Sequence, residues 1–419
     1  MVDRVALETK LREQSEAFFL RIVERCPNLF AAVPLFVSDT QVAQMRAVIE
    51  AVESVVALPG WRAEISLPSP LGGGVGGEGI SSSENLSLSP GEREFLVPRA
   101  KGVFFGYDFH LDADGAHLVE INTNAGGAFL NALLLESQRD VAMPGEAAAS
   151  GDLEQVFLEM FQNEWRLERG AAPLQTIAIV DEQPEEQFLY PEFVLAQRMF
   201  ERAGISALIA DPAELQLRAD GLYCRERKVD LVYNRLTDFS LQQHATLGAA
   251  CQNSDLAVIT PHPHAYALYA DKYNLTLLTD AARLHALGVA DDTIATLQAG
   301  IPQTRVVRAA DAEHWWMERK QWFFKPATGF GSRGVYRGEK LTKRVFEEIL
   351  QGGYVAQKFF HPGERMLCLE GAEPAPLKSD VRCYVYNGQL QLVAARLYQG
   401  QATNFRTAGG GFAPVRIVS

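Results

Sequence analysis

The chain has 419 residues, a length that predicts two or three structural units and a core large enough to need no disulfides. Its 47% hydrophobic residues exclude disorder throughout, and its formal net charge of −13 argues against a general nucleic-acid-binding protein. Five cysteines, an odd number without a C-x-x-C pair, argue against a zinc site, and the absence of a long apolar run or a signal peptide favours a cytoplasmic protein.

Two helices are expected in the first part of the chain. Apolar residues recur at helical spacing over 5–25, and a second helix is expected over 39–58, where Ser38 and Gln41 form a capping box and Gly60 closes the segment. The segment 66–93 is rich in Gly, Ser and Pro and has no aromatic residue. We interpret it as a flexible surface insertion, because no strand or lysine frames its glycines for phosphate binding.

The middle of the chain alternates strands and helices. Two strands within 102–122 are joined by a turn at Asp112–Gly115, and 128–168 is expected to be helical with a break at Pro144. A β-α-β pattern begins near residue 175, so that 172–262 predicts a small parallel α/β unit.

The last third changes from helices to strands. Residues 265–300 are mostly helical, and from 320 the strands WFFKP, GVYRG and YVAQKFF surround a helix that ends at Gly352-Gly353. A hairpin turning at Asn387-Gly388 follows. No internal repeat is found.

A glycine-rich segment carries the first chemical signal. Gly329, Gly331, Ser332 and Gly334 belong to a G-x-G-x-x-G sequence, but a strand and no helix is expected to follow, so a dinucleotide fingerprint is not indicated. A strand–loop–strand hairpin of this kind can fold over phosphates and donate backbone N–H groups. Lys325, four residues earlier, could reach the same phosphates, the alternative being an ordinary solvated lysine.

Two further groups complete a possible nucleotide site. The strand end Gln357, Lys358, Phe359 and Phe360 could bind an adenine through backbone groups and apolar side chains, the alternative being a core strand. Asp108, Glu120 and Asn122 lie on two paired strands, and their oxygen ligands suit Mg²⁺ bridging phosphates. The alternative for this trio is a polar strand edge.

From Lys272 onward the chain resembles the ATP-grasp ligases, most closely the bacterial glutathione synthetase type. The matching segments are DKYNLTLLTD, WFFKPATGFGSRGV, YVAQKFF, SDVRCYVYNG and LVAARLYQGQATNFRTAGGG. The G-x-D and E-x-N segment that normally follows stands instead near the front, as GYDFHLDADGAHLVEINTNAGG. The chain therefore resembles a circularly permuted ATP-grasp protein, as glutathionylspermidine synthetase does.

The resemblance implies an α+β and α/β fold in which two α+β subdomains grip ATP beside a small parallel α/β domain. It assigns 1–170 to the permuted C-terminal part with the Mg²⁺ site, 171–264 to the small substrate domain and 265–419 to the nucleotide-binding part.

Roles of single residues also follow from the resemblance alone. It implies that Lys272 and Lys325 contact phosphates, that the glycine-rich segment covers them, and that Asp380 contacts the nucleoside. Arg382 and Arg396 would neutralise the transferring phosphoryl group. The residues that would position the acid substrate are Asn404, Arg406, Gly409, Gly410 and Gly411. Asp108, Glu120 and Asn122 would bind Mg²⁺.

Two features depart from the relatives. Glutathionylspermidine synthetases have an arginine two residues before the metal-binding Asp, where this chain has Gly106, so that Arg382 or Arg396 would supply the charge. A plain two-residue hairpin at Asn387-Gly388 would also put Arg382 and Arg396 on opposite faces, and only a bulge or a longer loop brings both to the nucleotide.

The sequence therefore predicts an ATP- and Mg²⁺-dependent ligase that joins a carboxylate to an amine or a thiol through an acyl phosphate. The alternatives are a kinase on the same fold and a non-catalytic ATP-binding protein. The expected partners are small-molecule acids and amines and, as an option, a second copy of the chain; no nucleic acid or membrane is expected. Arg235 could bind a substrate carboxylate or form an ordinary salt bridge. His262 and His264 are expected in a loop rather than at a metal site.

Overall fold

The computed structural model describes residues 1–66, 97–148, 151–328, 334–368 and 373–419. The predicted insertion at 66–93 lies outside this part except for Ser66. The expected glycine-rich cover is also outside it, apart from Gly334, which closes that segment at φ +68°.

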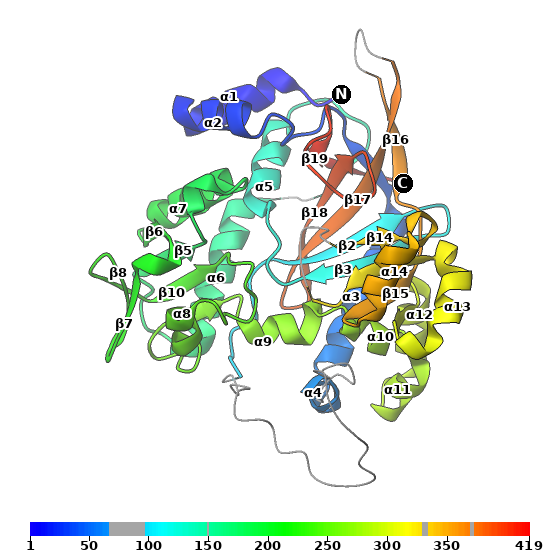
Figure 1. The fold of residues 1–419 in the computed structure, drawn as a ribbon. Coiled ribbons are helices and arrows are strands. Elements are labelled where there is room, and N and C mark those ends of the chain that lie inside the picture. Colours follow the sequence, from blue (N-terminus) through cyan, green and yellow to red (C-terminus); the bar gives the residue numbers. More distant parts are fainter. Residues whose placement is uncertain (67–96, 149–150, 329–333, 369–372) are drawn as a thin grey trace.

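A six-stranded sheet joins the front and the rear of the chain (Figure 1). Its strands run in the order β19-β18-β17-β2-β3. Strand β16 pairs with the first part of β17, on the same edge of β17 as β2. The strands are β2 (Phe105–Leu111), β3 (Ala116–Asn122), β16 (Gly363–Leu367), β17 (Ala375–Tyr386), β18 (Gln389–Tyr398) and β19 (Gly411–Ala413). Antiparallel pairing of β2 with β17 sets Asp108 opposite Arg382, which is the juxtaposition that a circular permutation requires.

The two ends of the chain also meet. Strand β1 (Leu35–Ser38) pairs in parallel with β20 (Val415–Val418), whose other edge pairs with β4 (Glu146–Ala147). Helix α3 (Asp39–Val56) begins at the predicted capping box and packs against β2 and β3. Its buried face includes Met45 and Val52, which share one apolar core with Val381 on the sheet. The expectation that Gly60 ends this helical segment is wrong, because a further helix α4 (Pro59–Ser66) contains that glycine.

The predicted parallel α/β unit is present. Its sheet has the order β11-β10-β5-β6, with every neighbouring pair parallel. The strands are β5 (Thr176–Val180), β6 (Ser206–Ala210), β10 (Leu231–Asn234) and β11 (Val258–Thr260), accompanied by helices α7 (Tyr190–Arg202) and α8 (Ala245–Ala250). A small antiparallel sheet of β7 (Leu215–Arg218), β8 (Gly221–Cys224) and β9 (Arg227–Val229) extends it.

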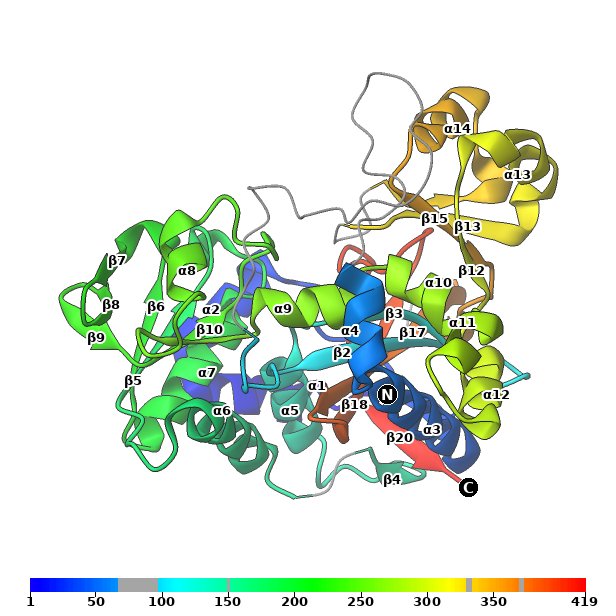
Figure 2. The same cartoon turned by 90° about the horizontal axis from the view of Figure 1, so that it is seen from below.

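Another antiparallel sheet forms a small lobe that stands apart from the central sheet (Figure 2). Its order is β12-β15-β13-β14, and helices α13 (Ala312–Glu318) and α14 (Lys343–Leu350) cover it. The strands are β12 (Thr304–Val306), β13 (Trp322–Pro326), β14 (Tyr336–Arg337) and β15 (Tyr354–Lys358). The predicted strand–loop–strand arrangement is confirmed for its two strands, since β13 and β14 pair antiparallel across the glycine-rich segment.

Helices elsewhere differ in detail from the sequence prediction. Residues 5–25 form two helices, α1 (Arg4–Gln14) and α2 (Glu16–Arg25), because Ser15 is extended and caps the second through a hydrogen bond from the Phe18 N–H. The expected helix over 128–168 is α5 (Ala128–Ser137) and α6 (Leu153–Arg169), with β4 between them. Short helices bridge the α/β unit to the small lobe: α9 (Pro263–Ala265), a π-helix (Tyr266–Ala270), α10 (Tyr273–Leu278), α11 (Ala281–Ala286) and α12 (Asp291–Gly300).

All five cysteines are free thiols, and four of them are buried. The loop expected at His262 and His264 is instead the start of the short helix α9, which contains His264. His262 caps α9 by accepting a hydrogen bond from the His264 N–H, so both histidines lie at a helix start. Within the described ranges, no helix has the length and apolar character needed to cross a bilayer.

Candidate active site

A cavity of about 410 Å³ lies where the small lobe faces the central sheet. Its walls come from β2, β3, β13, β15, β17 and β18, so segments more than two hundred residues apart in sequence contribute to it. The predicted residues that line it are Asp108, Glu120, Asn122, Lys272, Lys325, Gln357, Lys358, Phe359, Phe360, Asp380, Arg382 and Arg396. The spatial convergence on which the sequence prediction depends is therefore present.

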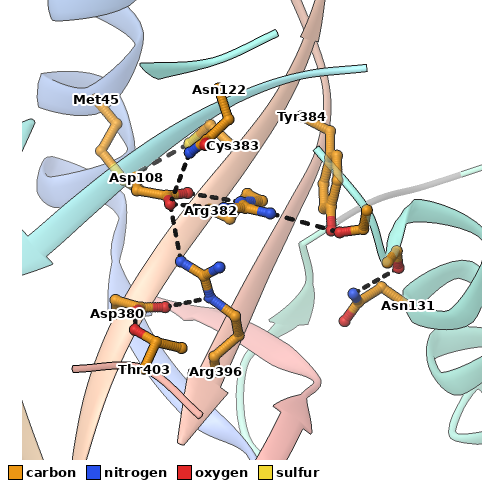
Figure 3. Close-up of polar contacts among 12 residues, drawn as sticks. Met45, Asp108, Asn122, Asn131, Asp380, Arg382, Cys383, Tyr384, Arg396 and Thr403 are labelled. Atoms are coloured by element: carbon orange, nitrogen blue, oxygen red, sulfur yellow. Dashed lines mark hydrogen bonds and ion pairs between the residues drawn. The ribbon is translucent and has the colours of Figure 1, made fainter. Parts of the chain in front are cut away.

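Asp108 forms the centre of a buried ion-pair cluster (Figure 3). The Arg382 guanidinium binds it in a bidentate manner, with Nε 2.6 Å from Oδ1 and Nη2 2.6 Å from Oδ2. Nη2 of Arg396 lies 2.9 Å from Oδ2, and Nδ2 of Asn122 donates to the same oxygen at 3.2 Å. The two arginines hold the pKa of Asp108 at about 2, although burial acts in the opposite direction.

A β-bulge brings both arginines to this face. Tyr384 faces Leu392 while Val385 faces Leu390, so Gln391 is an extra residue on β18. Asp380 consequently faces Arg396 directly, and Arg382 lies two residues from Asp380 on the same strand. This is the bulge that the sequence required if both arginines were to contact one ligand.

The glycine at position 106 is explained by the same cluster. It faces Tyr384 across the β2–β17 pair, beside the side chain of Arg382. A Cβ atom at this position would lie 3.0 Å from Arg382 Nε and 2.6 Å from Ala125 Cβ. The Arg382 side chain therefore occupies the space into which a side chain at position 106 would project.

The Asp380 carboxylate accepts hydrogen bonds from two neighbouring side chains. Its Oδ1 accepts a hydrogen bond from Arg396 Nε at 2.7 Å, and its Oδ2 accepts one from the Thr403 hydroxyl. Thr403 belongs to the connection between β18 and β19, so Asp380 orients an arginine and ties that connection to the sheet.

Two lysines surround the other carboxylate. Nζ of Lys272 lies 2.9 Å from Glu120 Oε1. Nζ of Lys325 donates to Gln357 Oε1 at 2.7 Å and to the Val119 carbonyl at 2.9 Å. Val119 is a bulged residue, because Asp108 faces Glu120 while Phe109 faces Leu118. The bulge leaves its carbonyl available to hold the lysine.

The surroundings of Glu120 and Lys325 shift the pKa values of both side chains. Burial raises the pKa of Glu120, but the charges of Lys272 and Lys325 outweigh it and hold that pKa below its ordinary value. Burial lowers the pKa of Lys325 to about 8, which the carboxylates only partly oppose. The Glu120 shift thus follows from the lysine charges beside it, and the Lys325 shift follows from burial.

The oxygen ligands fit Mg²⁺ in part. Nδ2 of Asn122 donates to Asp108, and within the described ranges its amide oxygen accepts no hydrogen bond. Glu120 contacts Lys272 through one of its two oxygens. Asp108 already accepts four hydrogen bonds, so it could ligate a metal only after a neighbour moves. Among the described residues no group of three His, Cys, Asp or Glu side chains could hold a metal. Mg²⁺ would therefore need Asn122 and ligand oxygens as well.

The predicted adenine segment begins at the last residues of β15 and continues into the connection toward β16. Its two phenyl rings already have neighbours, since Arg337 lies 4.4 Å above the Phe359 ring and His117 packs against Phe360 with centroids 3.9 Å apart. Phe359 and Phe360 nevertheless line the cavity, as Arg337 does, so a planar base bound there would contact this segment.

Several lining residues were missed by the sequence analysis. They are His110, Arg337, Lys340, Lys378, Gln401, Thr403 and Phe405. The period-2 pattern of β2 could have identified His110, which lies two residues after Asp108 and points to the same face. The same pattern could have identified Lys378, which lies two residues before Asp380 on β17. The others lie in loops, at the end of β14 or in a 3-10 helix, where no strand periodicity indicates a direction.

The residues expected to position an acid substrate are not brought to the cavity wall. Asn404 donates to the carbonyls of Gln399 and Ala402 and accepts from the Arg406 N–H, so it stabilises its own loop. A Cβ at Gly410 or Gly411 would meet the carbonyls of Leu397 or Asn28. Gly409 is likewise turned toward the N-terminal segment, where its carbonyl accepts a hydrogen bond from the Ala32 N–H.

Arg235 is also outside this cavity wall and lies buried between the α/β unit and the loop after β3. Its Nη1 donates to Asn124, and its Nη2 lies 4.0 Å from Glu192 Oε2. Glu192 in turn accepts the backbone N–H groups of Gly127 and Phe129 at the start of α5. The substrate role predicted for Arg235 stays a prediction, and the contacts present are those of an interdomain anchor.

Solved structures show a likeness of fold. A glutathione synthetase-like effector (GSS30) from Globodera pallida, solved in its apo form, has a TM-score of 0.55 at 11% identity, covering 99% of this chain and 97% of that chain. A putative gamma-glutamylcysteine synthetase from Methylobacillus flagellatus KT has a TM-score of 0.47 at 9% identity, covering 75% of this chain and 81% of that chain. The ATP-grasp ligase PsnB, complexed with minimal precursor, Mg and ADP, has a TM-score of 0.31 at 12% identity, covering 57% and 88%. No protein-family profile matches the sequence, and no curated protein does.

The first of these likenesses extends over nearly the whole of both chains and shows a common fold. The mixed α and β sheets, with a small lobe facing a sheet that is assembled from both ends of the chain, agree with the predicted circularly permuted ATP-grasp fold of the glutathione synthetase type.

Proposed function

We propose that this protein is an ATP- and Mg²⁺-dependent ligase that activates a carboxylate as an acyl phosphate and transfers the acyl group to an amine or a thiol. The substrates would be small molecules such as amino acids, short peptides or polyamines.

The charge of the cavity wall is the observation that carries this proposal. Of the residues that the structure describes, eight cationic side chains line it against three carboxylates, a balance that suits a ligand with several negative charges, such as a triphosphate. The cations are Lys272, Lys325, Arg337, Lys340, Lys358, Lys378, Arg382 and Arg396. The carboxylates are Asp108, Glu120 and Asp380.

The lysines and the arginines would contact different phosphate groups of the nucleotide. Lys272 and Lys325 border Glu120 and would hold the phosphates beside it. Arg396 and Arg382 are fixed by Asp108, so their orientation costs little when a phosphoryl group arrives. Mg²⁺ bound by Glu120 and Asn122 would neutralise part of the phosphate charge.

The bond changes follow from carboxylate chemistry. A carboxylate is a poor acyl donor, because its leaving group would be oxide. Attack of a carboxylate oxygen on the γ-phosphorus forms an acyl phosphate and releases ADP. An amine then attacks the acyl carbon, loses a proton and expels phosphate. Guanidinium donors that face the tetrahedral oxyanion would each contribute about 3 kcal/mol of transition-state stabilisation, and no cysteine is needed as a nucleophile.

One observation supports a kinase as the second candidate function. Asn404, Arg406 and the glycines 409–411, which were expected to position the acid, do not line the cavity. A kinase would transfer the phosphoryl group to a hydroxyl and would retain it in the product, whereas the ligase releases inorganic phosphate.

The two candidates are separated by measuring ADP and inorganic phosphate together. The protein is screened with Mg²⁺-ATP against amino acids, short peptides and polyamines, with and without hydroxylamine. Hydroxylamine intercepts an acyl phosphate and yields a hydroxamate, so a ligase gives equal amounts of ADP and phosphate and a hydroxamate with the correct acid. A kinase gives ADP without phosphate, and a non-catalytic binding protein retains ATP unchanged.

Two substitutions test whether this cavity is responsible. Lys325→Ala and Glu120→Gln should abolish ADP release while the thermal unfolding temperature stays within a few degrees of the parent protein. The matched controls are Lys320→Ala and Glu347→Gln, because both side chains are exposed on the small lobe away from the cavity. Turnover that persists in both site variants would overturn the assignment of the site.

A further inference from the structure

Two histidines of the β2–β3 hairpin contact Phe360, which is the last residue of the predicted adenine segment (the base-binding segment). His110 on β2 and His117 on β3 are direct cross-strand partners. Nδ1 of His110 lies 3.2 Å from the carbonyl oxygen of Phe360. The His117 ring packs against the Phe360 ring in a tilted arrangement, with centroids 3.9 Å apart and an angle of 34° between the planes. The hairpin that carries Asp108 and Glu120 therefore also holds Phe360.

The two histidines differ in what they can reach. His110 lines the cavity, and among the described residues the bond to Phe360 is the hydrogen bond its ring makes. His117 is buried, pairs with Asp112 Oδ1 at 3.2 Å and is absent from the cavity wall. A ligand can thus contact His110 but not His117.

The bond to Phe360 determines the chemistry that His110 offers. A carbonyl oxygen only accepts hydrogen bonds, so the hydrogen must lie on Nδ1. In the neutral imidazole with its hydrogen on Nδ1, the second nitrogen carries a lone pair. Nε2 of His110 is then a hydrogen-bond acceptor, and His110 lines the cavity together with Phe360.

We propose that His110 selects the nucleobase by accepting a hydrogen bond from an exocyclic amino group through Nε2. This inference rests on the proposed function, because it presumes that a nucleotide occupies the cavity with its base beside Phe360. The amino group at position 6 of adenine is such a donor, and the oxygen at the same position of guanine is not. His117 serves as a positioning residue that keeps Phe360, and with it His110, in place.

The experiment compares two nucleotides that differ in one group. Purine riboside 5′-triphosphate lacks the 6-amino group of ATP and otherwise has the same hydrogen-bonding atoms. Dissociation constants of both are measured at pH 8 with Mg²⁺ and without an acid substrate, so that no turnover occurs. The parent protein should bind ATP about tenfold more tightly, as expected for one hydrogen bond.

Three variants separate direct contact from positioning. His110→Asn keeps a donor near the position of Nδ1 and lacks Nε2, so the two nucleotides should bind equally. His110→Gln places an amide oxygen near the position of Nε2 and should retain most of the preference. His117→Phe keeps a ring against Phe360 and should leave the tenfold ratio unchanged.

The outcomes distinguish this inference from the function on which it rests. A parent protein that binds neither nucleotide would overturn the proposed function. Equal binding of both nucleotides by the parent protein would overturn the role of His110 even if no variant folds. An unchanged ratio in His110→Asn, or a ratio lost equally in His117→Phe, would show that the base does not contact Nε2.

Discussion

Replacing Asp108 with Asn tests the central ion-pair cluster. The substitution keeps the size of the side chain and removes the charge that both Arg382 and Arg396 contact. It also leaves two buried guanidinium groups close together without their shared carboxylate. We therefore expect Asp108→Asn to lower the free energy of unfolding.

The magnitude can be worked from the pKa of Asp108. Its fall from 3.8 to about 2 spans roughly 1.8 pKa units, which at about 1.36 kcal/mol per unit corresponds to about 2.5 kcal/mol. The folded pKa is depressed, so this stability is present above pH 3.8 and is lost as the pH falls toward 2. Breaking a buried ion pair by removing one partner costs about 3–5 kcal/mol. We expect a loss of about 3 kcal/mol at pH 7.

The assay is urea-induced unfolding of the full chain followed by far-ultraviolet circular dichroism, at pH 5, 7 and 8. The difference between Asp108→Asn and the parent protein should be the same at all three values, because each lies above both pKa values of the carboxyl. Asp114→Asn, an exposed aspartate of the same hairpin, is the matched control and should change stability by less than about 0.5 kcal/mol. An Asp108→Asn protein as stable as the parent would refute the proposed energetic role of the cluster.

Three further predictions concern other parts of the chain. Burial raises the pKa of Asp181 to about 6, so ionisation of this carboxyl destabilises the folded state above that pH. Asp181→Asn should therefore add up to about 3 kcal/mol to the free energy of unfolding at pH 8 and almost nothing at pH 4. Urea titration at both pH values measures the difference. Gly106→Ala should destabilise the protein by about 1–3 kcal/mol, because the new methyl group would meet Ala125 and Arg382; thermal unfolding measures the loss, and an unchanged unfolding temperature would contradict the packing. Lys325, with its pKa near 8, loses its proton as the pH rises above 8, so nucleotide affinity measured by calorimetry should fall between pH 7.5 and 9 in the parent protein and be independent of pH over this range in Lys325→Ala.

Much of the local structure was predictable from local signals. The capping box at Ser38 and Gln41 begins a helix wherever it precedes an apolar pattern, and it does so here. Asn387-Gly388 adopts positive φ angles at both positions, the conformation that this pair accepts at little cost in a tight hairpin. The alternation of strands and helices over 172–262 likewise predicted parallel strands.

Errors occurred where two elements were close in sequence. Ser15 interrupts an apolar pattern that runs through both α1 and α2, so periodicity alone could not locate the break. Gly60 was interpreted as a helix end, but it lies within α4, against the side chain of Leu287. The contact at Gly60 comes from a distant segment, whereas the break at Ser15 is stabilised by a local cap on α2.

The sequence by itself determined which chemical groups this protein can bring to a ligand. The acidic trio and Lys325 were identifiable from residue type and spacing, whereas Lys272 and the two arginines were identified only through the resemblance to the ATP-grasp ligases. Which of them meet, and how, depended on the tertiary structure. A single extra residue, Gln391, turns Arg396 to the face of Arg382, and the bulge at Val119 frees a carbonyl for Lys325. Strand register is a property of paired strands, so the chain alone does not specify it.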